Sequence, residues 1–388
     1  MKRKTSPAMV TAAMLFITLV FVSGGCSTRG ADQSYDAASD SLRYTGEVHL
    51  RNIKQLTFGG NNAEAYWSFD NQQLIFQSDW NKINSQGCDQ IFIMNADGSP
   101  LEDGQQYRLV STGKGRTTCS FFLPDGRVIY ASTHEHDEEC PPAPTFPPGR
   151  YVWPLFPSYK IYIADADGSN ARVLINGDGY VAEPTVSPDG KYIIYTSTKS
   201  GDLDLWRYEI ETGEEIQLTD ELGYDGGAFF SRDSKMIVWR ASRPQGEKAE
   251  DYKKLLSQNL VEPSALNIFV ADIDGKNVRQ VTDLPGANWA PFFHPDGKKV
   301  LFCSNYESVG KGRPVFAIYM INIDGSGLKK ITHSQTFDAF PMFSFDGKKL
   351  VFCSNRNISR TPTRDTNVFV ADWVEEPEEV DLNFKSWK

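Results

Sequence analysis

Seven residues at or near the start of a repeated sequence unit have side chains that could form a binding site. Four are carboxylates and the others are an arginine, an asparagine and a tryptophan: Glu64, Glu183, Asp225, Asp338, Arg116, Asn288 and Trp289. Converging carboxylates can bind a cation or the ammonium end of a peptide, and the arginine offers a counter-charge. The indole can stack on a sugar or a peptide side chain. The alternatives are a solvated acidic rim and a tryptophan that only packs between units.

A second candidate lies in one long insertion. His134 and His136 stand two residues apart, Cys140 follows them, and imidazole and thiolate groups are zinc ligands. A zinc site needs a fourth ligand, and Cys140 could form a disulfide instead, so the identity of any metal stays open. Residues 141–159 are rich in proline and aromatic residues, which can form a rigid cover or present rings to a partner.

The amino terminus has the organisation of an export signal. Three cations at positions 2–4 precede an apolar run over residues 8–22, which is too short to span a bilayer comfortably. The run ends at Val22-Ser23-Gly24-Gly25-Cys26, which resembles the processing box of a bacterial lipoprotein. We therefore expect a signal peptide over residues 1–25, lipidation of Cys26 and a polar tether over residues 26–52. The alternative is an ordinary cleaved signal in which Cys26 is incidental.

The other five cysteines fall into two groups. Cys303 and Cys353 occupy equivalent places in two repeats, where we expect small buried thiols rather than a bond between them. Any disulfide is expected among Cys88, Cys119 and Cys140, in a pairing that the spacing leaves open.

The charge balance disfavours nucleic acid as a partner. Lys and Arg number 40 against 50 Asp and Glu, which gives a formal net charge of −10 over 388 residues. An acidic surface repels phosphate backbones and anionic headgroups. We expect contact with a membrane through the lipid anchor alone.

Six repeats position the candidate residues. A segment such as Glu183–Ser197 recurs with its aspartate at Asp70, Asp125, Asp189, Asp233, Asp296 and Asp346. Each repeat contains four short β-strand patterns, and Asp-Gly pairs mark the hairpin turns between the first and second strands. Four short strands repeated at 40 to 50 residues plus insertions are typical of propeller blades. The sequence therefore predicts an all-β, six-bladed β-propeller of four-stranded blades over residues 53–374, followed by an acidic tail over residues 375–388.

The two ends of the repeat region complement each other. The sixth repeat ends at its third strand, near residues 367–372, whereas residues 53–57 resemble a fourth strand with no third strand before it. Adding this amino-terminal strand to the last blade would pair two exposed edges. We therefore expect it to close the ring.

The long insertions all fall between second and third strands, so we expect them on one face of the ring. They cover residues 79–87, 134–159, 244–265, 306–315 and 357–366, and residues 247–260 have the pattern of a short helix. The loops that enter each innermost strand open on the same face and surround the channel mouth. A decorated face beside a plain one is where we expect function.

The turn Ser187–Lys191 and the third strand Asn267–Gly275 resemble the propeller repeats of TolB and its relatives. The resemblance extends over residues 53–374 and implies the propeller fold. TolB carries an α/β domain before its propeller that engages the inner-membrane Tol machinery, whereas only residues 27–52 separate Cys26 from the first propeller strand here.

The sequence thus predicts a TolB-like propeller that binds a protein or peptide, or serves as a scaffold, in the bacterial cell envelope. We expect an outer-membrane-anchored lipoprotein that faces the periplasm or the surface. No catalytic residue is assigned, and no cofactor is required. The alternatives are a glycan-binding protein or a lyase or hydrolase that uses the channel mouth, with His134, His136 or Glu183 in acid-base roles.

Overall fold

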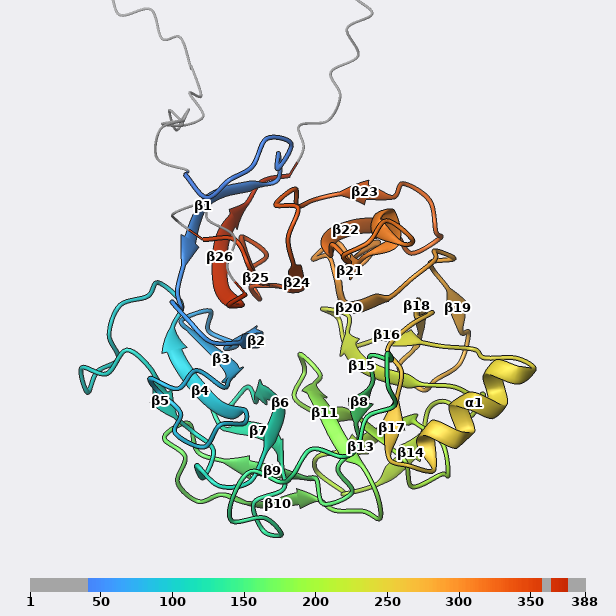
Figure 1. Cartoon of the computed structure of the whole chain (residues 1–388). Helices are drawn as coiled ribbons and strands as arrows, with labels where there is room; N and C mark the ends of the chain where they lie inside the picture. Colours follow the sequence, from blue (N-terminus) through green and yellow to red (C-terminus); the bar gives the residue numbers. More distant parts are fainter. Residues whose placement is uncertain (1–40, 358–363, 376–388) are drawn as a thin grey trace, which may run out of the picture. The chain divides into compact units, whose positions relative to one another are not determined.

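The computed structural model describes residues 41–357 and 364–375. Within them, six antiparallel four-stranded sheets surround a central axis (Figure 1). The innermost strands are β2 (Asn62–Trp67), β6 (Thr117–Phe122), β11 (Val181–Val186), β15 (Asp225–Phe230), β20 (Asn288–Phe293) and β24 (Asp338–Phe343). The second strands are β3 (Gln73–Ser78), β7 (Val128–Ser132), β12 (Tyr192–Ser197), β16 (Met236–Ala241), β21 (Lys299–Ser304) and β25 (Lys349–Ser354).

The outer half of each blade completes the sheet. The third strands are β4 (Gln90–Asn95), β9 (Lys160–Ala164), β13 (Asp204–Glu209), β18 (Asn267–Asp272), β22 (Ala317–Asn322) and β26 (Asn367–Trp373). The fourth strands are β5 (Arg108–Leu109), β10 (Arg172–Ile175), β14 (Glu215–Gln217), β19 (Arg279–Gln280), β23 (Lys329–Lys330) and β1 (Leu50–Gln55). The predicted six-bladed propeller is confirmed.

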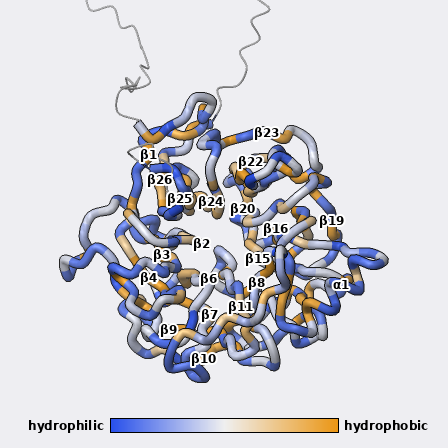
Figure 2. The backbone as a smooth tube through the Cα atoms, viewed as in Figure 1, coloured by the Kyte–Doolittle hydropathy of each residue, from blue (hydrophilic) through white to orange (hydrophobic). Residues whose placement is uncertain are grey.

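The second strands are apolar on both faces because each blade packs between two neighbours. In β12, β21 and β25 every residue after the first is buried. Figure 2 shows hydrophobic residues along the blades and hydrophilic ones in many of the outer connections. A strand buried on both faces loses the alternating pattern of a half-exposed strand.

The repeated aspartate marks the first turn of the blade. In the third blade the Ser187 hydroxyl donates to Asp189 Oδ1 at 2.7 Å and accepts the Tyr192 amide at 2.9 Å. Gly190 follows with a φ of 72°, a conformation in which glycine has no steric cost. The Ser-x-Asp-Gly pattern therefore specifies the hairpin that joins the two inner strands.

The predicted ring closure is also confirmed. The strand β1 pairs antiparallel with β26, so the amino-terminal strand is the outer strand of the last blade (Figure 1). Thr57 Oγ1 accepts the amide of Val368 at 2.9 Å. Thr219 in the third blade makes the same contact with the amide of Leu205, also at 2.9 Å. The amino-terminal segment thus reproduces the fourth-strand end of an ordinary blade.

The packed region begins earlier than the predicted boundary at residue 53. Leu42, Glu47 and His49 are buried, although they fall in the stretch expected to be a tether. The Glu47 carboxylate lies 2.8 Å from the Arg356 guanidinium. Sequence reasoning missed this contact because its partner is distant in the chain. The predicted signal peptide, Cys26 and residues 376–388 lie outside the described residues.

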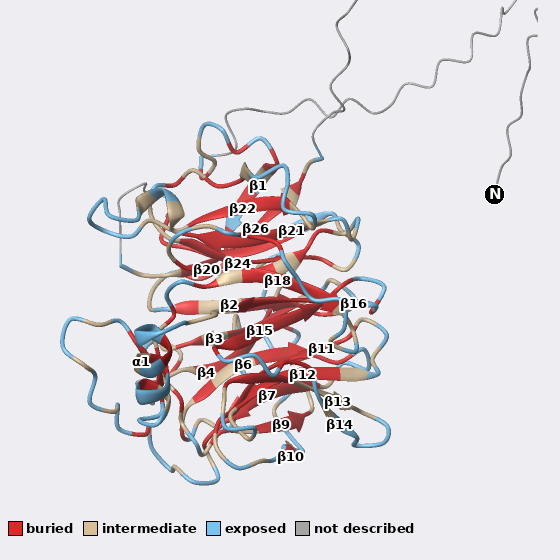
Figure 3. Ribbon diagram, turned by 90° about the vertical axis from the view of Figure 1, so that its right-hand side faces the viewer, coloured by how far each residue is buried: buried red, intermediate tan, exposed pale blue. Residues whose placement is uncertain are grey.

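The second-to-third connections elaborate one face, as Figure 3 illustrates for the helix α1 (Glu247–Leu256). The expected helix ends at Leu256, because Leu260 begins the short strand β17 (Leu260–Val261). A 3₁₀ turn, η1 (Tyr306–Ser308), lies in the fifth blade's connection. We call residues 134–159 of the second blade the strap. It contains the strand β8 (Trp153–Pro154), which pairs with β17 of the fourth blade.

Candidate functional site

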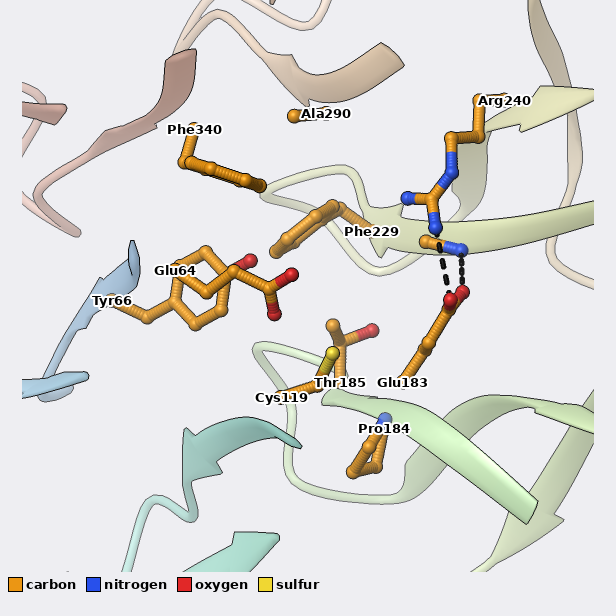
Figure 4. Close-up of a pocket in the computed structure, with 11 residues that line it drawn as sticks. Glu64, Tyr66, Cys119, Glu183, Pro184, Thr185, Phe229, Arg240, Ala290 and Phe340 are labelled. Atoms are coloured by element: carbon orange, nitrogen blue, oxygen red, sulfur yellow. Dashed lines mark hydrogen bonds and ion pairs between the residues drawn. The ribbon is translucent and has the colours of Figure 1, made fainter. Parts of the chain in front are cut away.

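One residue of each innermost strand faces the axis in the same backbone conformation. These six residues have φ angles between 44° and 60° and are Glu64, Cys119, Glu183, Gly227, Ala290 and Phe340. Each lies at a register shift between the first two strands of its blade. All six line one small cavity on the axis (Figure 4). We call them the axial ring.

The axial ring is costly to form. A residue other than glycine loses about 1 kcal/mol or more in the left-handed region, and five of the six members carry a Cβ. The bulge turns each of these side chains towards the axis, where no regular strand would place it. The repeated geometry therefore concentrates chemical groups at one point.

Aromatic side chains close the channel beneath the ring. The Tyr66 ring of the first blade and the Phe229 ring of the fourth blade meet across the axis, with centroids 5.3 Å apart. Phe121 and Phe292 pack against Phe229 at 6.3 and 5.3 Å. The axial ring is therefore the base of a blind pocket rather than part of an open pore.

A larger cavity of about 460 Å³ opens above the ring on the looped face. Eight of its lining residues are aromatic: Tyr151, Trp153, Phe156, Tyr159, Tyr180, Trp289, Phe337 and Phe340. The first four belong to the strap, so the strap forms part of the cavity wall. The Trp153 ring reaches the Trp289 ring of the fifth blade at a centroid distance of 5.2 Å.

Three covalent or ionic contacts hold the strap in place. A disulfide joins Cys140 in the strap to Cys88 of the first blade. Arg150 donates to Asp251 of α1 at 2.9 Å and, through Nε, to Glu262 at 2.8 Å. The strap thus links the first, second and fourth blades over the cavity.

Glu183 and Arg240 form a buried ion pair beside the ring. Arg240 Nη2 lies 2.9 Å from Glu183 Oε1, and Glu183 also accepts the Tyr224 hydroxyl at 2.7 Å and the Gly227 amide at 2.6 Å. A Cβ added to Gly227 would lie 1.8 Å from Arg240 Nη1. Gly227 has no side chain to offer to the axial ring. The Arg240 guanidinium, from the second strand of the same blade, occupies that space instead.

The other charged groups of the cavity differ in their pairing. Arg116 contacts Asp89 at 3.3 Å, while burial raises the pKa of the Asp89 carboxyl to about 6. Burial raises the pKa of Glu64 to about 7, although its hydrogen bond with Cys119 opposes this shift. Burial and the nearby carboxyl groups raise the pKa of the Cys119 thiol well above its usual value, so the thiol is protonated at neutral pH.

Several buried donors in this region have no acceptor among the described residues. They are Arg116 Nε, Arg240 Nε and Trp289 Nε1. A buried donor without a partner costs about 1 to 3 kcal/mol. These three atoms are enclosed by protein, so the cost falls on the stability of the cavity wall.

The structure divides the seven residues predicted for the channel mouth. Glu64, Arg116, Glu183 and Trp289 line the cavity. Asp225, Asn288 and Asp338 instead begin their strands, where each is fully buried. Asp225 contacts Arg243 at 2.8 Å, Asn288 accepts the Ser304 hydroxyl at 2.5 Å, and Asp338 accepts the Ser354 hydroxyl at 2.6 Å.

The reason for this division is the bulge. The first residue of the strand points into the blade, whereas the third residue points to the axis. Sequence reasoning missed Cys119 and Arg240, but the signal for Cys119 was present. Each member of the axial ring lies six residues before its repeat aspartate, as Glu64 precedes Asp70.

The structure does not assemble the candidate zinc ligands. No group of three or more His, Cys, Asp or Glu side chains within the described ranges is arranged to hold a metal ion. His134 Nδ1 lies 2.9 Å from Ser132 Oγ, His136 Nδ1 lies 2.8 Å from Asp137, and Cys140 is in the disulfide. The disulfide removes Cys140 from the candidate ligands, and a metal-binding role for His134 and His136 stays a prediction.

Replacing Glu64 by Gln is expected to stabilise the protein at high pH. The folded protein retains the Glu64 proton up to about pH 7, whereas the unfolded chain releases it near 4.5, so the fold loses stability as the pH rises through this range. Because the side chain is partly exposed, we expect a gain of roughly 2 kcal/mol for Glu64→Gln at pH 8 and none at pH 4. Urea unfolding across pH would measure it. Glu138→Gln, at an exposed position, is the control, and equal gains in both variants would contradict the prediction.

Removing the disulfide is expected to loosen the strap. Cys88→Ala with Cys140→Ala opens a loop with a sequence separation of 52, which in the chain-entropy model lowers the free energy of unfolding by roughly 4 kcal/mol. A reducing agent should therefore lower the melting temperature of the wild type and leave that of the double variant unchanged. Cys119→Ala, which removes a free thiol, should keep the response to reductant.

Comparisons with known proteins agree with the fold. A family model described as the TolB beta propeller domain (PD40) matches residues 260–361. The Tol-Pal system protein TolB of Francisella tularensis subsp. mediasiatica is 28% identical over an alignment of 173 residues, and the match covers 37% of this chain and 40% of that protein. The chain thus spans about 40% of the length of that relative. TolB of Bordetella pertussis is 27% identical over 155 residues, which are 40% of this chain and 31% of that protein.

A solved structure from Agrobacterium tumefaciens, assigned as TolB, superposes with a TM-score of 0.52 at 18% identity. The superposition covers 83% of this chain and 97% of that one. At this identity the likeness concerns the fold alone.

Proposed function

This chain carries a TolB-like six-bladed β-propeller, and on that premise we propose that it is a cell-envelope binding module whose looped face receives a protein or peptide partner. The relatives named above are proteins of a Tol-Pal system. The blind axial cavity beneath the strap is the proposed binding site, and the whole protein's role within any such system is part of the proposal.

The observation that carries the proposal is the state of the cavity. It combines eight aromatic residues with the charged side chains of Glu64, Arg116 and Arg240. A peptide offers polar and charged groups for such side chains and apolar side chains for aromatic walls. Glu64 also lowers stability above neutral pH, and natural proteins tolerate such costs chiefly where function requires them.

Export and anchoring at Cys26 remain part of this proposal. The basic stub, the apolar run and the cysteine box support them, and residues 1–40 are outside the described part of the chain. Among the residues that are described, no helix has the length and apolar character needed to span a bilayer. On this proposal the lipid at Cys26 attaches the protein to the membrane. Cys26→Ser should release the protein from the membrane fraction, and unchanged fractionation would reject the anchor.

Site-specific photo-crosslinking in native envelopes tests the binding role. Tyr151 is 72% exposed at the cavity, so a benzophenone amino acid there should capture a discrete protein. Val278 is 48% exposed in the turn between β18 and β19 on the opposite face, and the same amino acid there is the control. Capture from position 151 alone supports the proposal. Equal capture from both positions, or recovery of a glycan without protein, rejects it.

A further inference from the structure

The charges around the axial cavity are paired except at one residue. Its lining includes two cations, Arg116 and Arg240, and each already contacts a carboxylate. Arg116 lies 3.3 Å from Asp89, and Arg240 lies 2.9 Å from Glu183. Glu64 is the remaining carboxyl group of the lining, and it makes no ion pair with any described residue.

Glu64 is placed to meet a ligand. Its carboxyl group points into the middle of the axial ring, across from the Arg240–Glu183 pair (Figure 4). The Cys119 thiol lines the same cavity, and a thiol is a weak donor that does not neutralise charge. The left-handed conformation of Glu64, with a φ of 51°, holds the side chain towards the axis. The cavity thus ends at a carboxyl group that has no counter-ion among the residues described by the structure.

The cavity walls above Glu64 are aromatic, and aromatic rings can bind a cation. Phe340 lies beside it in the ring, and Trp289, Trp153 and Tyr151 line the approach from the looped face. The faces of aromatic rings attract ammonium and guanidinium groups, most strongly where water is excluded. An acidic group would instead be repelled by Glu64 and would find both guanidinium groups already paired.

We propose that Glu64 binds a cationic group of the ligand, an ammonium or guanidinium carried by a basic side chain or an amino terminus. This inference rests on the proposed binding role of the same cavity and specifies the chemistry of the partner. The partner enters from the looped face, its cation contacts the carboxylate, and the aromatic residues surround the rest of the inserted group.

Binding of a cation is coupled to release of a proton from Glu64. The carboxyl must ionise to pair with the ligand, and burial keeps it protonated up to about pH 7 in the free protein. The titratable and charged groups that face Glu64 come from every neighbouring strand and from the strap, and they are Tyr66, Asp89, Cys119, Tyr159, Glu183, Arg240 and Cys353. Asp89, whose pKa burial raises to about 6, also titrates near this range, so the Glu64→Gln variant is needed to assign the response to Glu64.

The test uses blocked tripeptides as probes. N-acetylated, C-amidated Gly-X-Gly peptides with X as lysine, norleucine or glutamate are titrated into the purified protein, and binding is followed by isothermal titration calorimetry. The lysine peptide should bind at least about tenfold more tightly than the norleucine peptide, since a charge-assisted contact has this magnitude. Glu64→Gln should abolish the preference, and Glu138→Gln should keep it. A norleucine peptide with a free amino terminus separates a terminal ammonium from a side-chain one.

The pH dependence gives a second measurement on the same protein. With the pKa of Glu64 at about 7, the lysine peptide should bind about tenfold more weakly at pH 6 than at pH 8. Glu64→Gln should remove this difference. Equal binding of the lysine and norleucine peptides, a preference that survives Glu64→Gln, or tighter binding of the glutamate peptide would each overturn the inference.

The two proposals fail in distinguishable ways. If position 151 captures a protein while the probes show no preference for a cation, the inference about Glu64 fails and the binding role stands. If the lysine preference depends on Glu64 while position 151 captures nothing, the cation site stands and the proposed protein partner is rejected.

Discussion

Replacing Arg356 by Met is expected to lower the free energy of unfolding by about 3 to 5 kcal/mol. The Arg356 guanidinium is fully buried between two fully buried carboxylates, Glu47 at 2.8 Å and Asp338 at 3.1 Å. It also donates to the Leu42 carbonyl oxygen at 3.3 Å. Methionine fills similar space but leaves two carboxylates without a cation in the interior.

The measurement is urea unfolding of the variant at several pH values. Because unpaired buried carboxylates hold protons more tightly in the folded state than in the unfolded chain, the loss should shrink as the pH falls towards 4. Arg127→Met is the control, because Arg127 pairs with Asp125 on the surface and its loss should cost less than about 1 kcal/mol.

A second control separates charge from packing. Adding Glu47→Gln and Asp338→Asn to Arg356→Met removes the uncompensated charges and should restore part of the stability. If Arg356→Met and Arg127→Met lower the free energy of unfolding by the same amount, the buried ion cluster does not stabilise the amino-terminal segment.

Deleting residues up to Thr57 is expected to destabilise the whole ring rather than one end. The deletion removes β1 and exposes the edge of β26, and it removes the buried side chains of Leu50, Ile53 and Leu56. Burial of each such side chain contributes about 1.5 to 3 kcal/mol, so the loss should exceed about 5 kcal/mol and approach the stability of an ordinary domain. The melting temperature should fall in a single transition for all blades.

Matched chains keep this prediction testable even if the deletion does not fold. A chain that begins at residue 41 should melt like the longer protein, because β1 and Glu47 remain. In a second chain, residues 48–57 are moved behind residue 375 through a short glycine turn. His49 accepts the Val374 amide at 2.9 Å, so the moved strand can re-enter its place as a hairpin. Full recovery is not expected, because the moved-strand chain lacks Glu47. An unchanged melting temperature after deletion, or a moved strand that raises it no further than the deleted chain, would contradict the closure.

The fold could be predicted from the sequence because its signals are local and repeated. The Ser-x-Asp-Gly turn at Ser187 carries its own hydrogen bonds, and the apolar second strands report burial on both faces. The closing strand was recognisable because Thr57 and Thr219 end similar segments. Such features depend on neighbours in the chain, so no knowledge of distant contacts was needed.

The candidate site could be predicted only in part. Glu64, Arg116, Glu183 and Trp289 line the cavity as expected, but Asp225, Asn288 and Asp338 stabilise their blades from within. A strand alternates its side chains between two faces, and a bulge shifts which residue turns towards the axis. Because the sequence analysis did not include the bulge, it assigned the first residue of three innermost strands to the channel mouth. In the structure the third residue of each strand faces the cavity instead.

The amino-acid sequence by itself determined the blade repeat, the turns, the strand that closes the ring and the face that carries the insertions. The tertiary structure alone decided which charges meet: Arg240 fills the space left by Gly227, Arg356 reaches Glu47, and the Cys88–Cys140 disulfide links the strap to the first blade. Pairings between distant residues depend on how blades are placed around the axis, which no local pattern encodes. For that reason the Glu64 carboxyl, which has no ion-pair partner within the described ranges, could be recognised only in the folded ring.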